Sequence, residues 1–367
     1  MKYTLKHSTL FLAVMATLMA AGTVHAQSNV TVYGLLDVGI DNVNNANAGK
    51  SSLTRVTSGG QNTSRWGLRG SEDLGNGLKA IFNLEGGLSL DTGTIDGGST
   101  QPLFKRQANV GLEGGFGRVV VGRSFSTTYD FMLPFDPMGY APSYSWATSS
   151  HATVNSFGSP SKYGMTTAFD NLIKYSGAAG PVKFGASYGF GEQASSSADS
   201  RKMAFGANYG VGPFALVATY EQINGNTVPA SGNRDKTTAY HLGASYTEGP
   251  LKIQAAVRDY KLDSNVATTR DLRGDLYWGG VTYQTTPVIV LTGAVYYQNV
   301  KNVVANADAD PIMYVGRVKY ALSKRTDLYV AAAYAKAKND KLVSLSRDDA
   351  GFGNSQRGVM AGVQHRF

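Results

Sequence analysis

Residues 72–91 read EDLGNGLKAIFNLEGGLSLD, a tight turn followed by a segment in which apolar and polar side chains alternate. The apolar positions are Leu78, Ala80, Phe82 and Leu84, and the polar positions include Lys79, Asn83 and Glu85. Successive side chains of a β-strand point to opposite faces, so this strand has one apolar face and one polar face. The stretch predicts a β-hairpin whose second strand separates a hydrophobic environment from water.

Similar short turns recur along the whole chain, each between two strand-like segments. They cover residues 72–77, 114–117, 177–181, 210–213, 247–250, 285–287 and 322–325. Seven hairpins supply fourteen strands, and one further strand at each end makes sixteen. The loops that join one hairpin to the next are longer and polar, an asymmetry that is typical of outer-membrane β-barrels. The expected fold class is therefore all-β, a sixteen-stranded antiparallel transmembrane β-barrel.

The predicted strands follow the hairpins and the alternation. They span residues 29–41, 63–72, 78–91, 103–113, 116–124, 169–177, 181–190, 201–209, 213–222, 237–247, 250–261, 272–284, 287–299, 312–321, 326–336 and 357–367. No linker interrupts them, so residues 27–367 are expected to form a single β-barrel domain. A secreted soluble β-sandwich used for adhesion would alternate in the same way with its apolar face buried, so periodicity alone leaves both architectures open. The loop asymmetry and the N-terminus favour the barrel.

The N-terminus has the pattern of an export signal. Lys2 and Lys6 precede an apolar run over residues 10–21, and the small-residue pattern Val24-His25-Ala26 follows. We predict a signal peptide at residues 1–26. The alternative, a membrane anchor helix, is disfavoured because the apolar run is shorter than the about 20 residues that a spanning helix needs.

Composition narrows the class further. The chain has no cysteine, and a closed barrel needs no disulfide because every backbone group is paired around the ring. Loss of the two signal lysines lowers the formal charge from +8 to +6, and no basic run indicates nucleic acid. The remaining His151, His241 and His365 are too far apart for a His-x-x-x-His metal pair or a recognisable Ser-His-Asp order. We expect no catalytic site, no metal site and no cofactor, and therefore no enzyme.

One connection is far longer than the others. Residues 125–168 contain Pro134, Pro137, Pro142 and Pro160 and show no sustained alternation. A loop of this length in a compact protein is normally functional. In a barrel that is too wide for its own side chains to fill, we expect the loop to fold into the bore.

Six short segments occur in a fixed order from end to end of the mature chain. They read VTVYG at 30–34, SRWGLRGSEDLG at 64–75, RQANVGL at 106–112, GR at 122–123, LSKRT at 322–326 and GVQHRF at 362–367. In these segments the chain resembles the trimeric general diffusion porins of Gram-negative outer membranes, particularly their β-proteobacterial branch. The resemblance implies a porin homotrimer in outer-membrane lipid that passes small hydrophilic solutes and ions passively.

The resemblance also implies a pore constriction in which acids of the folded-in loop face bases of the barrel wall. The residues that would form it are Arg65, Arg106 and Lys162 on the basic side and Asp136 and Asp130 on the acidic side. Lys162 is near enough in sequence to replace a base that the family usually carries at the position of Ala168. Enteric members of the family also carry a lysine where Leu35 stands here. Opposed charges across a narrow aqueous bore orient dipolar solutes and sort ions by sign.

Two arguments assign Arg106 differently. Periodicity groups it with the apolar residues of 108–112, which suggests the outside of the barrel, whereas the resemblance directs it into the pore. The alternative to a pore role is a surface salt bridge. Arg65 is less ambiguous, because Trp66 and Leu68 occupy the opposite face of its strand.

Two further residues receive roles from the resemblance. Arg123 is expected to contact an acidic loop of the neighbouring subunit. Phe367 ends the last strand on its apolar face, and in the family such a terminal aromatic residue is read by the barrel-assembly machinery while the last strand pairs with the first. The alternative is that Phe367 is only one more residue that faces lipid.

Charged residues on the predicted lumen faces are mostly basic. The bases are Arg65, Arg69, Lys79, Lys174, Lys183, Lys202, Lys252, Arg258, Arg273, Arg317, Lys319 and Arg366, and the acids are Asp37, Glu85, Glu221, Asp275 and Asp327. We therefore expect a weakly anion-selective diffusion channel in the Gram-negative outer membrane. The alternative is a substrate-specific channel with a saturable binding site, for which Tyr140, Tyr144 and Trp146 on the long loop are candidates.

Overall fold

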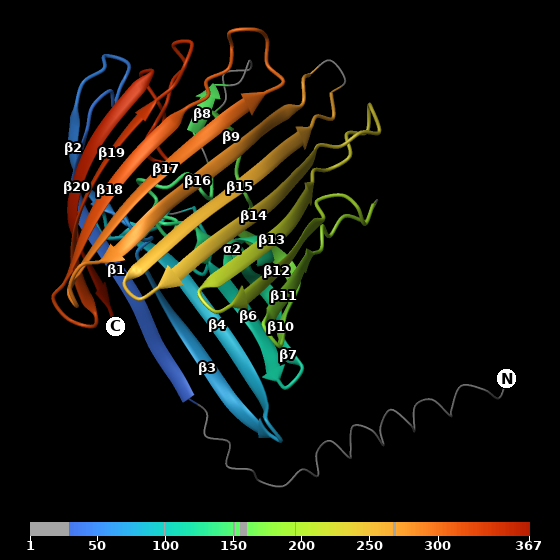
Figure 1. Cartoon of the computed structure of the whole chain (residues 1–367). Helices are drawn as coiled ribbons and strands as arrows, with labels where there is room; N and C mark the ends of the chain where they lie inside the picture. The colour runs from blue at the N-terminus through green and yellow to red at the C-terminus, as the bar shows by residue number, and fades with distance from the viewer. Residues whose placement is uncertain (1–28, 99, 150, 155–159, 195, 267–268) are drawn as a thin grey trace, which may run out of the picture.

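The strands of the molecule form a closed ring. The computed structural model describes residues 29–98, 100–149, 151–154, 160–194, 196–266 and 269–367, and the predicted signal peptide lies outside this part of the chain. Within it, sixteen antiparallel strands follow one another in chain order, and the last pairs with the first (Figure 1). The predicted fold class is confirmed, and closure of the ring excludes the β-sandwich.

The wall strands have lengths that suit a tilted barrel. They are β1 (Asn29–Val43), β3 (Arg65–Gly75), β4 (Leu78–Ser89), β6 (Gln107–Gly114), β7 (Gly117–Phe125), β10 (Ala168–Ala179), β11 (Val182–Gly189), β12 (Lys202–Val211), β13 (Phe214–Asn224), β14 (Lys236–Glu248), β15 (Leu251–Asp263), β16 (Leu272–Gln284), β17 (Ile289–Lys301), β18 (Ile312–Ala321), β19 (Thr326–Lys336) and β20 (Ser355–Arg366). Each corresponds to one predicted strand.

Long loops lie at one end of the barrel and tight turns at the other (Figure 1). The turn between β3 and β4 shows why its sequence suits it. Asn76 and Gly77 have φ angles of 52° and 76°, a left-handed conformation that asparagine and glycine tolerate best. The turn chemistry thus fixes where each strand reverses, and the alternation fixes which face is apolar.

Two short strands extend the wall at the long-loop end. β1 pairs with β3 through residues 29–35 and with β2 (Leu53–Ser58) through residues 38–43. The two-residue β5 (Thr94–Ile95) pairs with the end of β4. Neither strand was predicted, because both lie in loops without an alternating pattern long enough to indicate a strand.

The connection between β7 and β10 contains the short helical segments of the described residues, α2 and η1. α2 (Thr127–Met132) is capped by Ser126, whose hydroxyl accepts a hydrogen bond from the Tyr129 amide at 3.1 Å. The 3-10 turn η1 (Leu133–Phe135) follows, and β8 (His151–Val154) pairs with β9 (Pro160–Lys162) further along. Within the described residues, no helix is long and apolar enough to cross a membrane.

The apolar core lies between this connection and the inner face of the wall. From the connection come Met132, Phe135, Met138, Tyr140, Tyr144, Trp146 and Tyr163, and from the wall come Val217, Leu276, Trp278, Tyr296 and Met313. The Trp278 indole donates to the Phe135 carbonyl oxygen at 3.0 Å, and the Gln254 amide donates to that of Pro134 at 2.7 Å. Inward-facing side chains of the wall therefore hold the loop directly.

The inward position of Trp278 corrects one part of the lumen prediction. Arg273 and Asp275 alternate with Leu276 and Trp278 along β16, so they lie on the outer face, where Asp275 forms an ion pair with Lys301. The prediction failed because it assumed that apolar residues always point outward. At Leu276 and Trp278 the inner face is apolar, because the loop covers it there.

Candidate functional site

Arg65 and Arg106 meet at a single carboxylate on the inner wall. The Arg106 Nε donates to Glu85 Oε1 at 2.7 Å, and the Arg65 Nε lies 3.8 Å from Glu85 Oε2. Glu85 is buried, whereas both arginines keep part of their surface exposed. Two guanidinium groups therefore share one negative charge, and the group as a whole is positive.

The structure shows where the Arg106 side chain lies, and its pore role stays a prediction. β6 begins at Gln107, so Arg106 precedes the strand and the strand's alternation does not fix its direction. Its amide donates to the Glu85 carbonyl oxygen at 3.2 Å, which holds the side chain next to the Glu85 carboxylate. Val110 and Leu112 lie exposed on the outer face, as periodicity predicts. Arg106 thus lies on the lumen side, although strand alternation would group it with the outward-facing Val110 and Leu112.

Glu85 is held by a phenol as well as by the arginines. The Tyr33 hydroxyl lies 2.8 Å from Glu85 Oε2 and 2.8 Å from Asn83 Oδ1, and the Arg69 guanidinium lies over the Tyr33 ring at 4.9 Å. Sequence reasoning placed Glu85 in the lumen but missed it as the shared partner. The register could have indicated it, because Gly67, two residues after Arg65 and on the same face of β3, pairs with Glu85.

Aromatic rings connect the two arginines to the long loop. The Arg106 guanidinium lies 5.1 Å from the centre of the Phe125 ring. Phe125 stacks on Tyr129 of α2 with ring centres 4.5 Å apart, and Tyr129 contacts Tyr140 at 4.9 Å. A cation over an aromatic face is attracted by the ring's negative potential. These contacts fix the position of α2 relative to the basic side of the wall.

The acid of α2 faces a second base of the wall. Asp130 forms an ion pair with Lys174 of β10, and the same ammonium group donates to the Phe125 carbonyl oxygen at 3.0 Å. Lys174 is buried, while the Asp130 side chain is 42% exposed. The sequence indicated Lys174 only as one of many lumen bases. Its contact with the loop singles it out.

Asp136 occupies a different environment from the one expected of a pore acid. Only 3% of its surface is exposed. Its carboxylate accepts hydrogen bonds from the hydroxyl groups of Tyr296 and Ser145 and from the amides of Tyr140 and Met138. Burial raises the pKa of this carboxyl group, and the hydrogen bonds oppose the rise. The structure thus places Asp136 between loop and wall, where it ties the two together.

The other two basic residues of the prediction, Lys162 and Arg123, have different described partners. Lys162 pairs through its backbone with His151 in the hairpin of β8 and β9, and its side chain lies outside what the structure describes. Arg123 forms an ion pair with Asp170 and donates to the Lys105 carbonyl oxygen. The expected subunit contact of Arg123 stays a prediction, as does the pore role of Lys162.

A cavity of about 830 Å³ opens beside the arginine cluster on the long-loop side. Its charged lining consists of Lys105, Arg106, Arg123, Arg347, Asp96 and Asp348. Hydroxyl groups of serine and threonine line much of the remainder, including Ser58, Thr148 and Thr166. This space is hydrophilic and large enough for small solutes.

The three aromatic residues proposed for a saturable site are not available to a solute. Tyr140, Tyr144 and Trp146 are buried in the core between loop and wall. His241 is also buried, with its Nδ1 at 3.1 Å from the Thr219 hydroxyl. No group of histidine, cysteine, aspartate and glutamate in the described ranges could hold a metal ion.

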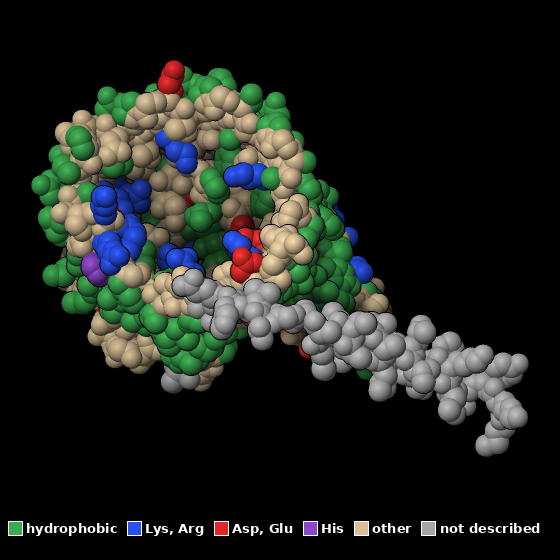
Figure 2. All heavy atoms as spheres, turned by 90° about the horizontal axis from the view of Figure 1, so that it is seen from below, with side chains coloured by type: hydrophobic (Ala, Val, Ile, Leu, Met, Phe, Trp, Pro, Cys, Tyr) green, Lys and Arg blue, Asp and Glu red, His purple; other side chains and the backbone are tan. Residues whose placement is uncertain are grey.

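Basic side chains also gather at the tight-turn end of the bore. Figure 2 looks into this end and shows Lys and Arg side chains around the inside of the opening, with fewer Asp and Glu. The inner faces of β18 and β20 contribute Arg317, Lys319 and Arg366. The positive balance of the cluster at Glu85 therefore continues along the wall.

The C-terminal residue lies at the seam where the barrel closes. Phe367 follows β20, and its amide and carbonyl groups bond to those of Gly34 on β1. Its side chain is 44% exposed. Val359 on the same face of β20 is also exposed, so Phe367 ends an apolar outer stripe.

A closed barrel with an internal loop and a charged, hydrophilic cavity defines a channel-forming membrane protein. A family model described as Gram-negative porin matches residues 12–340. The chain belongs to the Gram-negative porin family. Its relatives in this family are channel proteins and not enzymes.

Individual relatives agree with the family. The chain is 44% identical to outer membrane porin protein 32 of Delftia acidovorans over 132 residues, which are 36% of this chain and 35% of the relative. It is 39% identical to an outer membrane porin protein of Bordetella pertussis over 132 residues, 32% of this chain and 34% of the relative. These matches span about a third of the length of the curated relatives.

One solved structure extends the likeness over nearly the whole chain. The anion-selective porin from Comamonas acidovorans superposes with a TM-score of 0.76 at 27% sequence identity, and the match covers 93% of this chain and 100% of that chain. Shared architecture over this length supports the closed antiparallel barrel.

Proposed function

We propose that this protein is an outer-membrane porin that passes small hydrophilic solutes and ions by passive diffusion, with a weak preference for anions. The observation that carries the proposal is the arrangement of Arg65 and Arg106 around the single carboxylate of Glu85. The loop between β7 and β10 narrows the bore next to this cluster. A positive group at the narrowest point favours anions, because less water screens it there.

The acids of the loop do not cancel this charge. Asp130 is paired with Lys174, so it and its partner together contribute no net charge. Asp136 is buried and hydrogen-bonded between loop and wall, which makes it an anchor of the loop. The constriction that we propose consists of Arg65, Arg106, Glu85, Asp130 and Lys174, and the net charge of these five residues is positive.

The outer surface of the barrel is apolar enough to face lipid. Exposed apolar residues alternate along the outer faces of the wall strands, for example Leu328, Val330 and Tyr334 on β19. We propose that outer-membrane lipid covers them and that three copies form a homotrimer, in which Arg123 contacts a neighbouring subunit. Export by the signal peptide and recognition of Phe367 by the barrel-assembly machinery complete the proposal.

The second candidate is a substrate-specific channel with a saturable binding site. The 830 Å³ cavity lined by basic and hydroxyl side chains favours it. The burial of Tyr140, Tyr144 and Trp146 argues against it, since these residues cannot form an aromatic track for a solute. General diffusion therefore accounts for more of the observations.

Single-channel recording in a planar bilayer separates the two. A diffusion channel gives a conductance that rises steadily with salt concentration and a positive anion preference under a salt gradient. A specific channel saturates, and its solute blocks the ion current in a concentration-dependent way. Absence of any stepwise conductance from correctly folded protein would contradict both.

A further inference from the structure

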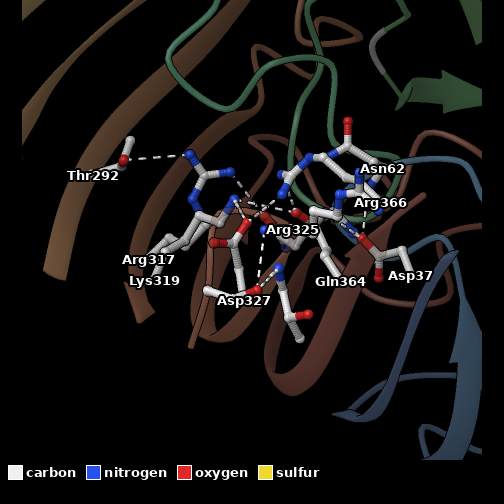
Figure 3. Close-up of polar contacts among 12 residues, drawn as sticks. Asp37, Asn62, Thr292, Arg317, Lys319, Arg325, Asp327, Gln364 and Arg366 are labelled. Atoms are coloured by element: carbon white, nitrogen blue, oxygen red, sulfur yellow. Dashed lines mark hydrogen bonds and ion pairs between the residues drawn. The ribbon is translucent and has the colours of Figure 1, made fainter. Parts of the chain in front are cut away.

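Lys319 of β18 and Arg366 of β20 share both of their acceptors (Figure 3). Asp327 Oδ2 lies 3.2 Å from the Lys319 Nζ and 2.8 Å from the Arg366 Nη1. Gln364 Oε1 accepts from the same two side chains at 3.1 and 3.3 Å. Both cations are therefore held side by side in a fixed geometry.

The contacts with Asp327 and Gln364 do not use all of the N–H donors of Lys319 and Arg366. An ammonium group has three N–H donors and a guanidinium group has five, so hydrogen-bond donors remain on both after these contacts. The Lys319 and Arg366 side chains are 22% and 41% exposed, whereas that of Asp327 is 15% exposed. Two positive charges thus share one carboxylate, and it is the cations that present the larger surface to the bore.

Arg317, the neighbouring base on β18, has a different role. Its Nη atoms lie 3.4 Å from the carbonyl oxygens of Pro137 and Met138 and 3.3 Å from the Thr292 hydroxyl. It is thus occupied in fastening the loop. In Figure 3 the loop passes above the cluster, which places Lys319 and Arg366 on the tight-turn side of it.

The register connects this pair to the constriction. Leu35 of β1 pairs with Arg366 on one side and with Arg65 on the other. Arg366 and Arg65 therefore lie in one row across three neighbouring strands, on the same inward face. With strands about 4.8 Å apart, their backbones are separated by only about 10 Å. An anion that leaves Arg65 meets Arg366 next along the wall.

We propose that Lys319 and Arg366 form a second binding step for small anions, contiguous with the constriction and on the tight-turn side of the loop. The step rests on the proposed function, because it acts on anions that permeate the bore. Its ligands are small inorganic anions and carboxylates, which fit the N–H donors that Asp327 and Gln364 leave free.

The test compares single-channel reversal potentials under a KCl gradient, with chloride as the probe. The double variant Lys319→Gln/Arg366→Gln removes two charges, each some 8 Å from a hydrated ion and each giving about a twofold effect, and should lower the anion-to-cation permeability ratio by about fourfold. Asp327→Asn, which keeps both cations and removes their counter-charge, should raise the ratio. The matched control is Arg325→Gln at the adjacent turn, whose exposed side chain makes no hydrogen bond or ion pair within the described residues.

Each possible result either supports or contradicts the second anion-binding step. If the double variant shifts the potential no more than Arg325→Gln does, the second step is wrong, even when the unmodified channel prefers anions. If the unmodified channel shows no anion preference, the proposed function fails. Opposite shifts in the double variant and Asp327→Asn would then still support the step. Because each channel is recorded individually, poor assembly of the double variant does not change its measured reversal potential. Asp327→Asn tests the same site with both cations in place.

Discussion

Gly34 and Phe367 exchange both of their backbone hydrogen bonds, with N···O distances of 3.1 and 3.2 Å. The aromatic ring of Phe367 lies over Gly34 so closely that a Cβ atom at position 34 would be 2.4 Å from the ring's Cζ. Only glycine leaves this space open. The last residue of the chain is thus seated on a specific residue of the first strand.

Gly34→Ala should therefore weaken closure of the barrel. The added methyl group must displace the Phe367 ring or the seam itself, and overpacking of this kind typically costs about 1–3 kcal/mol. The matched control is Gly293→Ala in β17, where a Cβ atom would meet nothing within 4 Å. On unboiled gels, we expect the folded band to be lost at a lower temperature for Gly34→Ala and near the unmodified temperature for Gly293→Ala. If both variants lose the folded band at the same temperature, the close packing of Phe367 on Gly34 does not stabilise closure.

Deletion of Phe367 should reduce the amount of assembled channel without changing the conductance of each one. The residue lies on the outer face at the seam, where its backbone bonds to Gly34. Membrane fractions quantify assembly, and bilayer recordings measure conductance. Normal assembly at native expression would leave Phe367 as an ordinary residue facing lipid.

Asp130→Asn should increase the anion preference, and Lys174→Gln should decrease it. The two residues form an ion pair beside the bore, so removal of either charge exposes the other. The effect of Asp130→Asn should be smaller than that of changes at Arg65 and Arg106, because water screens the partly exposed Asp130. Reversal potentials of the two variants provide the check, and shifts of the same sign would rule out this pairing.

The raised pKa of Asp136 predicts a pH dependence of loop docking. The folded pKa lies above the unfolded value of about 3.9, so this carboxyl group's contribution to stability is fully present below that pH. It is lost as the pH rises through the folded pKa. Asp136→Asn removes the titration and leaves the Tyr140 amide with a poorer acceptor, a change that typically costs about 1–3 kcal/mol.

The measurement is the temperature at which the folded band disappears on gels, for both proteins, between about pH 4 and about pH 7. The advantage of the unmodified protein over Asp136→Asn should shrink as the pH rises. A difference that stays constant or grows with pH would contradict the buried, raised-pKa environment. Comparison of the two proteins cancels the titration of groups that they share.

The barrel could be predicted because its determinants are local. Turn residues such as Asn76 and Gly77, and alternation such as that of residues 78–85, depend only on near neighbours in the chain. The strand alternation failed at β16, where Trp278 faces inward because residues more than 140 positions earlier cover it. A local pattern cannot reveal a partner at that distance.

The site was predictable only in part, for the same reason. The resemblance named Arg65 and Arg106, and the structure brings both to Glu85. That shared partner depends on strand register, and the contact of Lys174 depends on how α2 docks. The environment of Asp136 depends on four donors, one of which, the Tyr296 hydroxyl, comes from a strand 160 residues away. The sequence predicts the sign of the net charge in the bore, whereas the fold decides which charges are neutralised by a partner.

The most direct test of the central claim is the reversal potential of single channels under a KCl gradient, measured for the unmodified protein, Arg65→Gln/Arg106→Gln and Glu85→Gln. If two arginines around one buried carboxylate set the selectivity, the unmodified channel prefers anions, the arginine double variant shifts toward cations, and Glu85→Gln shifts further toward anions. An unchanged potential in the arginine double variant, together with a large shift on Lys183→Gln or Lys252→Gln, would contradict the account and place the constriction elsewhere.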